Sequence, residues 1–441
     1  MRRRDFLIGA GALTLTAAGG PLLFRSGRAF AGNTLVEELI PFNDCDTLEN
    51  IRAIIKHNNF RFEVDHNWLY DHYGFASTQA DASPRVVPQI IIPSAAVPPD
   101  PDLPPKFDLR DINGHSYISP LRDQAETGEC QQFGAAAAAE ASYNRHNGLY
   151  DDNCIILSPM YLRWVYSGGD NIGMGLYHGM TGSGMPWQGP TGQEGTCREE
   201  DFPFVSFDDH MGGSSSPPAI QLETAKAATR ITFRRCGLIY PYNYWETTNR
   251  IKRAIYRYGA VAAGILLSSA MRAYKSGVYE DSWIYPSTLP YLNSESNHAI
   301  ALVGWDDNPP EGGNGGCWIL RNTWGQSWGE GGYMRIRYFS AGVNSHNAYL
   351  EAESPGDGSL KMYGSVKVDG GDLIGTTITL SGDDSFEAVC IGSDYGFSTL
   401  KPGHYRLTPY KPGILFTPLY QDVNLTAGYA VVNFSGIALD G

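Results

Sequence analysis

The chain has 441 residues, 42% of them hydrophobic, which is more apolar material than a single core uses. Its formal net charge is −14, and the first 31 residues hold five arginines against one aspartate, so the rest of the chain stands near −18. Such an acidic chain is a poor ligand for nucleic acid or for an anionic membrane surface, and neither is an expected partner.

Residues 1–31 have the pattern of a targeting segment. An arginine cluster precedes an apolar run from Phe6 to Phe24, and Ala29-Phe30-Ala31 forms a small-x-small cleavage site. The run from Arg3 to Leu7 resembles the twin-arginine export signal of bacteria. An ordinary signal or an uncleaved anchor is the alternative. We expect an exported protein, periplasmic or extracellular, whose mature part contains no further apolar run long enough to span a membrane.

Residues 32–104 are expected to form a prosegment and a linker. Between Glu37 and Tyr73 apolar residues recur at helical spacing, and Phe60 to Val64 is more strand-like. Residues 82–105 are rich in proline, which predicts an extended, exposed segment suited to proteolytic cleavage.

Residues 105–353 have a helical first half and a stranded second half. An alanine-rich helix is expected from Gln131 to Asn147, and a second helix from Tyr244 to Tyr258. The expected strands are Val261 to Leu267, Ala299 to Trp305, Trp318 to Arg321 and Tyr333 to Arg337. This order predicts an α+β domain with two lobes.

Residues 358–441 change character, with short alternating stretches separated by Gly, Pro and Asp turns. This pattern predicts a small all-β sandwich. Its expected strands are Lys361 to Val368, Thr376 to Leu380, Ala388 to Ile391, Gly403 to Pro409 and Ala430 to Phe434.

Seven cysteines in an exported chain suggest disulfides, and their odd number leaves at least one thiol unpaired within the monomer. Cys130 is the candidate for that free thiol. Two bridges could form among Cys154, Cys197, Cys236 and Cys317, in a connectivity that the sequence leaves open. Folding in a reducing cytoplasm before export would instead allow all of them to remain thiols.

Cys130 follows a glycine-bearing loop and stands at the first turn of the alanine-rich helix. Free backbone N–H groups and the positive end of the helix dipole favour a thiolate at this position, so we expect a lowered pKa for Cys130. A nearby histidine would stabilise the thiolate further as an ion pair. The alternative is a buried, apolar cysteine.

His298 stands at the mouth of an apolar strand, where the imidazole can face a cleft with a pKa usable near neutrality. Asn322 follows a later strand, and its side-chain carbonyl can accept the histidine N–H and fix the tautomer. The tryptophans that follow Asn322 can shield this hydrogen bond from water. The alternatives are a structural or exposed histidine and a glycine-punctuated turn with core aromatics.

Together these segments resemble the papain-like cysteine peptidases. That family has a glutamine six residues before its nucleophilic cysteine and a phenylalanine three residues after it, as at Gln124, Cys130 and Phe133. It also has a histidine that opens a strand of the form His-Ala-x-x-x-x-Gly-Trp, as at His298. The signature Asn-Thr-Trp-Gly-x-x-Trp-Gly-x-x-Gly-Tyr matches residues 322–333.

The resemblance implies a catalytic role for three residues: Cys130 attacks the peptide carbonyl, His298 moves the proton and Asn322 holds the histidine. It also implies that the Gln124 side chain and the Cys130 backbone N–H form the oxyanion hole, and that Trp324 covers the Asn–His contact. Further residues expected in the substrate cleft or its shielding are Gly128, Asn297 and Trp328.

The chain departs from the family pattern near the nucleophile. Thr127 replaces a cysteine three residues before it, and Gln131 replaces an aromatic residue just after it. One disulfide near the site is therefore missing, and the packing of the cleft must differ. His298 lies 168 residues after Cys130, beyond the roughly 130 to 150 typical of such chains, so we expect insertions near residues 168–195 or in the 280s.

Two further segments resemble parts of known enzymes. Residues 47–71 resemble the short prosegment of cathepsin B-type zymogens, which lies across the cleft, so the chain's own prosegment is an expected inhibitor. A constitutive helical cap is the alternative. Residues from about 358 to 441 resemble carboxypeptidase regulatory-like domains of transthyretin-like fold, for which adhesion, substrate tethering to a surface or simple stabilisation all fit.

The sequence therefore predicts a cysteine endopeptidase that acts on proteins or peptides, needs no cofactor and is made as a zymogen. No histidine pair resembles the exopeptidase loop of cathepsin B. No metal site is expected, because the oxygen-rich stretch from Asp306 to Glu311 lacks EF-hand spacing. The competing hypothesis is a catalytically inactive, peptidase-like binding or adhesion protein.

Overall fold

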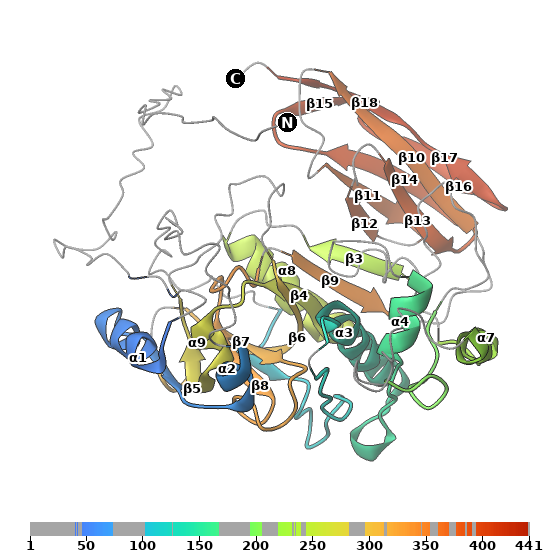
Figure 1. Cartoon of the computed structure of the whole chain (residues 1–441). Helices are drawn as coiled ribbons and strands as arrows, with labels where there is room; N and C mark the ends of the chain where they lie inside the picture. Colours follow the sequence, from blue (N-terminus) through green and yellow to red (C-terminus); the bar gives the residue numbers. More distant parts are fainter. Residues whose placement is uncertain are drawn as a thin grey trace, which may run out of the picture.

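The computed structural model describes residues 40, 42, 46–73, 102–125, 127–166, 195–204, 219–231, 233, 235–239, 244–281, 296–312, 315–344, 346–352, 360–369, 376–383, 386–389 and 394–439. Several predicted features lie wholly or mostly outside these ranges: the targeting segment 1–31, the proline-rich linker, and the two regions in which an insertion is expected, residues 168–195 and the 280s. Figure 1 shows an α+β body joined to a separate group of strands near the C-terminus.

One nine-stranded sheet forms the frame of the body. Its order is β1-β5-β8-β7-β6-β4-β9-β3, and β2 pairs with β6 beside this path. The strands are β1 Arg61–Val64, β2 Lys106–Asp108, β3 Arg235–Ile239, β4 Val261–Ile265, β5 Tyr274–Tyr279, β6 His298–Asp306, β7 Cys317–Arg321, β8 Tyr333–Arg337 and β9 His346–Glu351. All residues of β4 and β7, and all but the last of β6, are buried, which explains their nearly continuous apolar sequences.

The helices divide the body into two lobes (Figure 1). Helices α3, α4 and α7 lie together on one side of the sheet, and α1, α2 and α9 lie beside β1 and β5 on the other. The helices are α1 Leu48–His57, α2 Trp68–Tyr73, α3 Cys130–Asn147, α4 Pro159–Tyr166, α7 Ala219–Ala227, α8 Tyr244–Tyr258 and α9 Ser269–Arg272, with a 3₁₀ turn at Asp151–Asn153. The predicted two-lobed α+β architecture is confirmed.

Small side chains let α3 approach β6 closely. Six alanines of α3 are buried, and a Cβ added to Gly134 would meet the backbone of Ala299 and Ile300 at 3.3 Å. The helix ends at Gly148, whose φ of 64° is the left-handed conformation typical of a helix C-cap. The close packing brings the first turn of α3 next to the first residues of β6.

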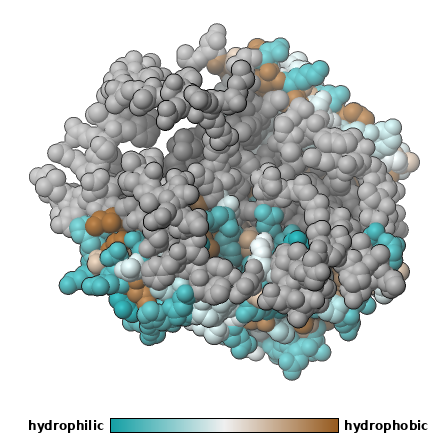
Figure 2. Space-filling model, in the orientation of Figure 1, coloured by the Kyte–Doolittle hydropathy of each residue, from teal (hydrophilic) through white to brown (hydrophobic). Residues whose placement is uncertain are grey.

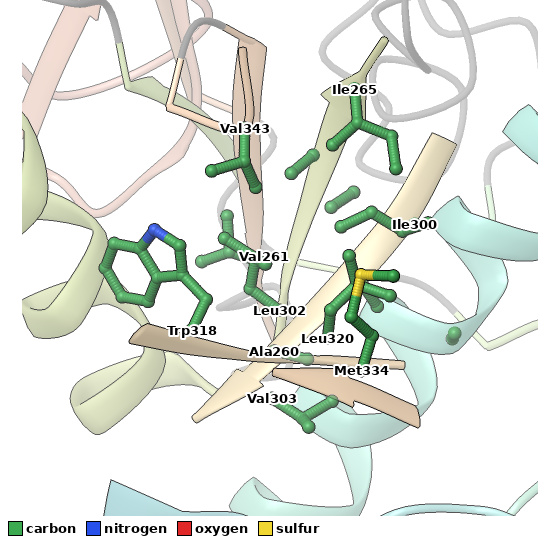
Figure 3. Close-up of a cluster of buried hydrophobic side chains, with 14 of the residues drawn as sticks. Ala260, Val261, Ile265, Ile300, Leu302, Val303, Trp318, Leu320, Met334 and Val343 are labelled. Atoms are coloured by element: carbon green, nitrogen blue, oxygen red, sulfur yellow. The ribbon is translucent and has the colours of Figure 1, made fainter. Parts of the chain in front are cut away.

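The main core lies between the central strands. Figure 3 shows Val261 and Ile265 of β4, Ile300 and Leu302 of β6, and Leu320 of β7 packed together. The buried Trp318 indole contributes to this cluster and donates to Asn344 Oδ1 at 2.9 Å, so its polar atom is satisfied. A smaller cluster lies in the helical lobe and contains Met160, Tyr161, Cys197, Phe202 and Ala225.

Residues 46–73 dock on the sheet lobe. Strand β1 pairs antiparallel with β5, and the Phe62 ring packs on Tyr279 with centroids 4.7 Å apart. Asp65 forms an ion pair with Lys275 at 3.3 Å, and Arg61 donates to the Glu311 carbonyl. The described part of this segment therefore extends the sheet at its β5 edge.

The C-terminal strands form a two-sheet sandwich with its own core. A five-stranded sheet has the order β13-β10-β18-β15, with β17 on β10, and a four-stranded sheet has the order β12-β11-β14-β16. The strands are β10 Leu360–Asp369, β11 Thr377–Gly382, β12 Phe386–Val389, β13 Asp394–Leu400, β14 Gly403–Tyr410, β15 Ile414–Thr417, β16 Gln421–Leu425, β17 Tyr429–Val431 and β18 Phe434–Ala438. The all-β prediction is confirmed, although the single strand expected from Ala430 to Phe434 is in fact two strands.

The sandwich meets the body along one edge. Strands β12 and β13 contact β3, the last strand of the nine-stranded sheet. On the face shown in Figure 2, hydrophobic patches break the mostly hydrophilic described surface over the C-terminal strands. Exposed large apolar side chains of the sandwich include Leu415, Leu419, Tyr429, Val431 and Ile437.

Candidate active site

Cys130 is the first residue of α3 and is a half-buried, free thiol. The Ala299 backbone N–H, one residue beyond His298, acts on the Cys130 sulfur as a hydrogen-bond donor, as do the N–H groups of Gln131 and Cys130 itself. The structure therefore places the sulfur where α3 begins and at the start of β6. Cys130 and His298, the first residues of α3 and β6, thus lie on neighbouring elements although they are 168 residues apart in sequence.

His298 opens β6 and is held in one orientation. Its Nε2 lies 2.9 Å from Oδ1 of Asn322, which also accepts the Thr323 backbone N–H at 2.9 Å. Because a carbonyl oxygen only accepts, the proton of the neutral imidazole is on Nε2 and the lone pair is on Nδ1. His298 and Asn322 are 5% and 1% exposed, so water competes little for this hydrogen bond.

Two tryptophans cover the His–Asn pair. The Trp324 ring stacks on His298, with centroids 4.5 Å apart and planes 18° from parallel. Trp328 packs edge-on against Trp324 at 4.9 Å, and its Nε1 donates to the Arg272 carbonyl at 3.1 Å. The predicted shielding by Trp324 thus has the required geometry, and Trp328 supports it from the other side.

The expected protonation of the pair is wrong for this conformation. Burial raises the pKa of Cys130, and the nearby backbone N–H groups offset this only in part. Burial lowers the pKa of His298 to about 4; the hydrogen bond to Asn322 opposes this change and the positive charge of Arg272 adds to it. The loss of water around both groups therefore outweighs the effect of the helix terminus on these two pKa values.

Gln124 is buried in the loop before α3. Its Nε2 donates to the Thr127 carbonyl at 2.8 Å, and its Oε1 accepts the Thr323 hydroxyl at 2.5 Å. The Thr127 hydroxyl donates back to the Gln124 carbonyl at 2.6 Å. Thr127, which replaces a cysteine of the family pattern, therefore closes this loop by hydrogen bonds. One of the two Gln124 amide protons is still available to a ligand.

Gly128 and Asn297 stand at the surface beside the pair. A Cβ added to Gly128 would meet no atom within 4 Å, so the loop surface is open there. Asn297 accepts the Leu267 backbone N–H at 2.7 Å through its side chain, which ties the residue before His298 to the end of β4. Gly128 and Asn297, which precede Cys130 and His298 by two residues and one residue, are both exposed.

The sequence reasoning missed three charged residues near the site. Glu129, the N-cap of α3, is buried and paired with Arg163 of α4. Arg321, directly before Asn322, pairs with the buried Glu140 of α3 at 3.6 Å. Arg272 ends α9 close enough to His298 to act on its pKa. In the sequence, only one feature points to two of these residues: Glu129 directly precedes Cys130, and Arg321 directly precedes Asn322.

The two predicted disulfides are not formed. Cys154, Cys197 and Cys317 are free cysteines, and burial raises their pKa values, to about 12 for Cys197 and Cys317. They lie in different parts of the body, on the loop after the 3₁₀ turn, in the helical-lobe cluster and on β7. Cys154, Cys197 and Cys317 are therefore thiols, which is the alternative to two disulfides that the sequence left open.

The oxygen-rich stretch is occupied by ion pairs. Asp306 pairs with Lys106 at 3.3 Å, Asp307 with Lys252 at 2.6 Å, and Glu311 with Arg335 at 2.7 Å. Among the described residues, no group of three or more His, Cys, Asp or Glu side chains is arranged to hold a metal ion. In the same ranges, no helix has both the length and the apolar character that crossing a membrane requires.

Comparison with known proteins gives consistent matches over the body. A viral cathepsin of Heliothis zea nuclear polyhedrosis virus is 28% identical, over 54% of this chain and 54% of its own. Cathepsin K of Gallus gallus is 28% identical, over 50% and 55%. The chain thus spans about half the length of these relatives. The match to the structure of digestive procathepsin L 3 of Tenebrio molitor covers 69% of this chain and 87% of that chain, at 18% identity and a TM-score of 0.46.

The family model described as papain family cysteine protease matches residues 103–350. This span is more than half of the chain, and it includes Cys130, His298 and Asn322. The chain therefore belongs to the papain family of cysteine proteases.

Proposed function

We propose that this protein is an exported cysteine endopeptidase that hydrolyses peptide bonds through Cys130, His298 and Asn322. The observation that supports this most directly is the 2.9 Å hydrogen bond between His298 Nε2 and Asn322 Oδ1, covered by Trp324, with the Cys130 sulfur at the Ala299 N–H. A peptidase needs its nucleophile and its base side by side, with the base held in one tautomer.

The proposed reaction begins with proton transfer from the Cys130 thiol to Nδ1 of His298, whose lone pair is available because Asn322 holds the proton on Nε2. The thiolate then attacks the scissile carbonyl and forms a carbon–sulfur bond. The Cys130 N–H and the second amide proton of Gln124 stabilise the oxyanion. The imidazolium gives its proton to the leaving amine as the carbon–nitrogen bond breaks. Water, deprotonated by His298, hydrolyses the thioester and restores the thiol.

The prosegment is the proposed inhibitor of the enzyme. Residues 46–73 are anchored on the sheet lobe by β1–β5 pairing, and α2 packs on α9 beside the site. Residues 74–101, which contain most of the proline-rich linker, lie outside the described ranges. Cleavage within this stretch would release a segment held by ion pairs such as Asp65–Lys275.

The proposal also includes export of the protein and its tethering by the C-terminal sandwich. Residues 1–31 support export to the periplasm or the cell exterior of a bacterium. Strands β12 and β13 of the sandwich contact β3 of the body, and the sandwich presents exposed apolar side chains such as Leu415 and Ile437. Both features suit a module that tethers the peptidase to a surface or a substrate.

Replacement of the nucleophile tests the proposal. In Cys130→Ala we expect no hydrolysis of a casein or peptide substrate and no self-processing, with an unchanged thermal transition. The wild-type chain should react with an epoxide inhibitor of cysteine peptidases at Cys130, identified by mass spectrometry of the labelled peptide. If the wild-type thiol stays unlabelled after removal of the prosegment, the inactive binding protein is the correct description.

A further inference from the structure

The loop that carries Gln124 is closed on itself by Thr127. The Thr127 hydroxyl donates to the Gln124 carbonyl at 2.6 Å, whereas the Thr127 backbone N–H reaches the same carbonyl only at 3.3 Å. Most N–H···O bonds are about 2.9–3.0 Å long, so the hydroxyl makes the stronger of the two closures. Ala125, inside the loop, has a φ of 50°, a conformation that a residue with a side chain keeps only where its surroundings hold it. The hydroxyl of Thr127 is therefore a principal contact that maintains this loop.

The side-chain amide of Gln124 is held at both of its ends. Its Nε2 donates to the Thr127 carbonyl at 2.8 Å, and its Oε1 accepts the Thr323 hydroxyl at 2.5 Å. A backbone carbonyl only accepts, so the nitrogen must face Thr127 and the amide cannot be turned around. Because the amide group is planar, these two contacts also fix the direction of its second N–H. Thr127 and Gln124 are each 5% exposed, so water competes little for these bonds.

A chain of hydrogen bonds connects this loop to the imidazole. His298 Nε2 lies 2.9 Å from Asn322 Oδ1, which also accepts the Thr323 backbone N–H at 2.9 Å. Thr323 then bonds to Gln124 twice, through its hydroxyl to Oε1 and through its carbonyl to the Gln124 backbone N–H at 2.8 Å. Thr127 stands at the far end of this chain. A loop that loosens at Thr127 therefore shifts the Gln124 amide relative to His298.

We infer that Thr127 is a positioning residue for the reaction, whose hydroxyl aims the second N–H of the Gln124 amide at the oxyanion of the tetrahedral intermediate. The inference rests on the proposed peptidase function and adds a residue to it. The oxyanion exists only after Cys130 has attacked the carbonyl, so a misplaced donor weakens the transition state and not substrate binding. Loss of the Thr127 hydroxyl must therefore lower kcat and leave KM nearly unchanged.

The first test compares two substitutions of Thr127 in the full chain after activation by limited proteolysis. Thr127→Val keeps the branched shape but removes the hydroxyl, and we expect kcat on a peptide substrate to fall about ten- to thirtyfold with KM within about twofold. Thr127→Ser keeps the hydroxyl and should restore kcat to within about threefold of the wild type. A fall in kcat of equal size in both variants would overturn the inference.

Thr196→Val is the matched control for removal of a buried hydroxyl. Thr196 is fully buried in the helical lobe, and its Oγ1 lies 3.5 Å from the carbonyls of Ser158 and Cys197. It has no contact with the Gln124 loop in the chain of bonds described above, so we expect an unchanged kcat. If Thr127→Val lowers kcat no more than Thr196→Val does, the hydroxyl of Thr127 positions nothing and the inference is wrong.

A double variant tests whether Thr127 acts through Gln124. Gln124→Ala should lower kcat about a hundredfold, because it removes one donor to the oxyanion. Adding Thr127→Val to Gln124→Ala should then lower kcat no further, since the amide that the hydroxyl positions is already absent. A second fall of about tenfold in the double variant would show that Thr127 supports the site by another route, and it would contradict the inference.

Alkylation by iodoacetamide separates the oxyanion donor from the nucleophile. The Cys130 sulfur displaces iodide from a saturated carbon, so no oxyanion forms and the rate reports only the thiol and its base. Mass spectrometry of the Cys130 peptide should give the same alkylation rate in the wild type and in Thr127→Val. A parallel loss of alkylation and hydrolysis would show a disturbed thiol–imidazole pair and overturn the inference.

The outcomes also distinguish this inference from the proposed function. If the activated wild type hydrolyses peptides and Thr127→Val is equally fast, the peptidase function stands and only the role of Thr127 fails. If the activated wild type hydrolyses no peptide although Cys130 is alkylated, the peptidase function fails and the inference fails with it.

Discussion

Replacing Glu140 by Gln should destabilise the body strongly, because Glu140 joins the two lobes directly beneath the site. Its carboxylate is fully buried on α3 and pairs with Arg122 at 2.7 Å and Arg321 at 3.6 Å. Its Oε1 also accepts the Leu157 backbone N–H at 2.9 Å. A Gln side chain can still accept that N–H, so the substitution removes the charge and little else.

The expected loss of stability follows from the buried charge of Arg321, which Glu140→Gln leaves in place. Arg321 is 2% exposed and donates to the Pro120 carbonyl at 2.7 Å, but without Glu140 its charge has no acidic partner among the described residues. Breaking a buried pair by removing one partner costs about 3–5 kcal/mol. For a body of this size that corresponds to a fall in Tm on the order of 10 °C. Arg122 loses less, because Glu199 remains 3.4 Å away.

Tryptophan fluorescence measures this effect without interference from the sandwich, since all nine tryptophans precede residue 358. Glu199→Gln is the matched control: its carboxylate is 23% exposed and contacts Arg122 at the longer distance, so we expect a loss of at most about 1 kcal/mol. If Glu140→Gln lowers the free energy of unfolding no more than this control does, the argument from the buried charge is refuted.

Two further predictions concern the His–Asn pair. Asn322→Ala should lower kcat by about a hundredfold, because the imidazole loses both its orientation and its fixed tautomer; unchanged kcat would contradict the role of Asn322. Acid should destabilise the fold through His298, since its pKa of about 4 lies below the ordinary 6.5 and the unfolded chain binds more protons between these values. Stability should therefore fall by up to about 3 kcal/mol as the pH drops from about 6.5 to 4. In His298→Gln this part of the pH dependence of Tm should disappear, and equal slopes would contradict it.

The fold could be predicted from sequence wherever an element is long and buried. The alanine-rich helix was expected from Gln131 and begins at Cys130, and the strand expected from Ala299 begins at His298. Several short strands were missed, because β3, β5 and β9 owe their pairing to partners far away in sequence. Their periodicity alone is too brief to distinguish a strand from a loop.

The break between β17 and β18 shows what kind of information was lacking. Val432 donates its N–H to the Tyr363 carbonyl at 2.9 Å and crosses directly over Gly364, where a Cβ would come within 1.6 Å of the Val432 carbonyl oxygen. The Asn433 side chain then accepts the Ser365 N–H at 2.8 Å. The residues from Ala430 to Phe434 read as one strand in sequence, but the crossing of Val432 over β10 divides them between β17 and β18.

The sequence motif points to the candidate site residues, but it does not report their pKa values. A motif fixes that Cys130 begins a helix, and a helix terminus acting alone lowers a thiol pKa. The depth of burial depends on Trp324, Trp328 and the packing of α3 on β6, none of which a linear pattern reports. The predicted sign of the Cys130 pKa change is therefore wrong.

Burial of this pair also determines how it ionises. A low-dielectric surrounding penalises a thiolate alone and an imidazolium alone, which is why the pKa of Cys130 is raised and that of His298 is lowered. Transfer of the proton from one to the other creates both charges at once and next to each other, so their attraction repays much of the lost hydration. Such a pair is expected to ionise together. The Trp324 ring, which stacks on His298 and shields its hydrogen bond to Asn322, therefore favours transfer of the proton within the pair over loss of a proton to water.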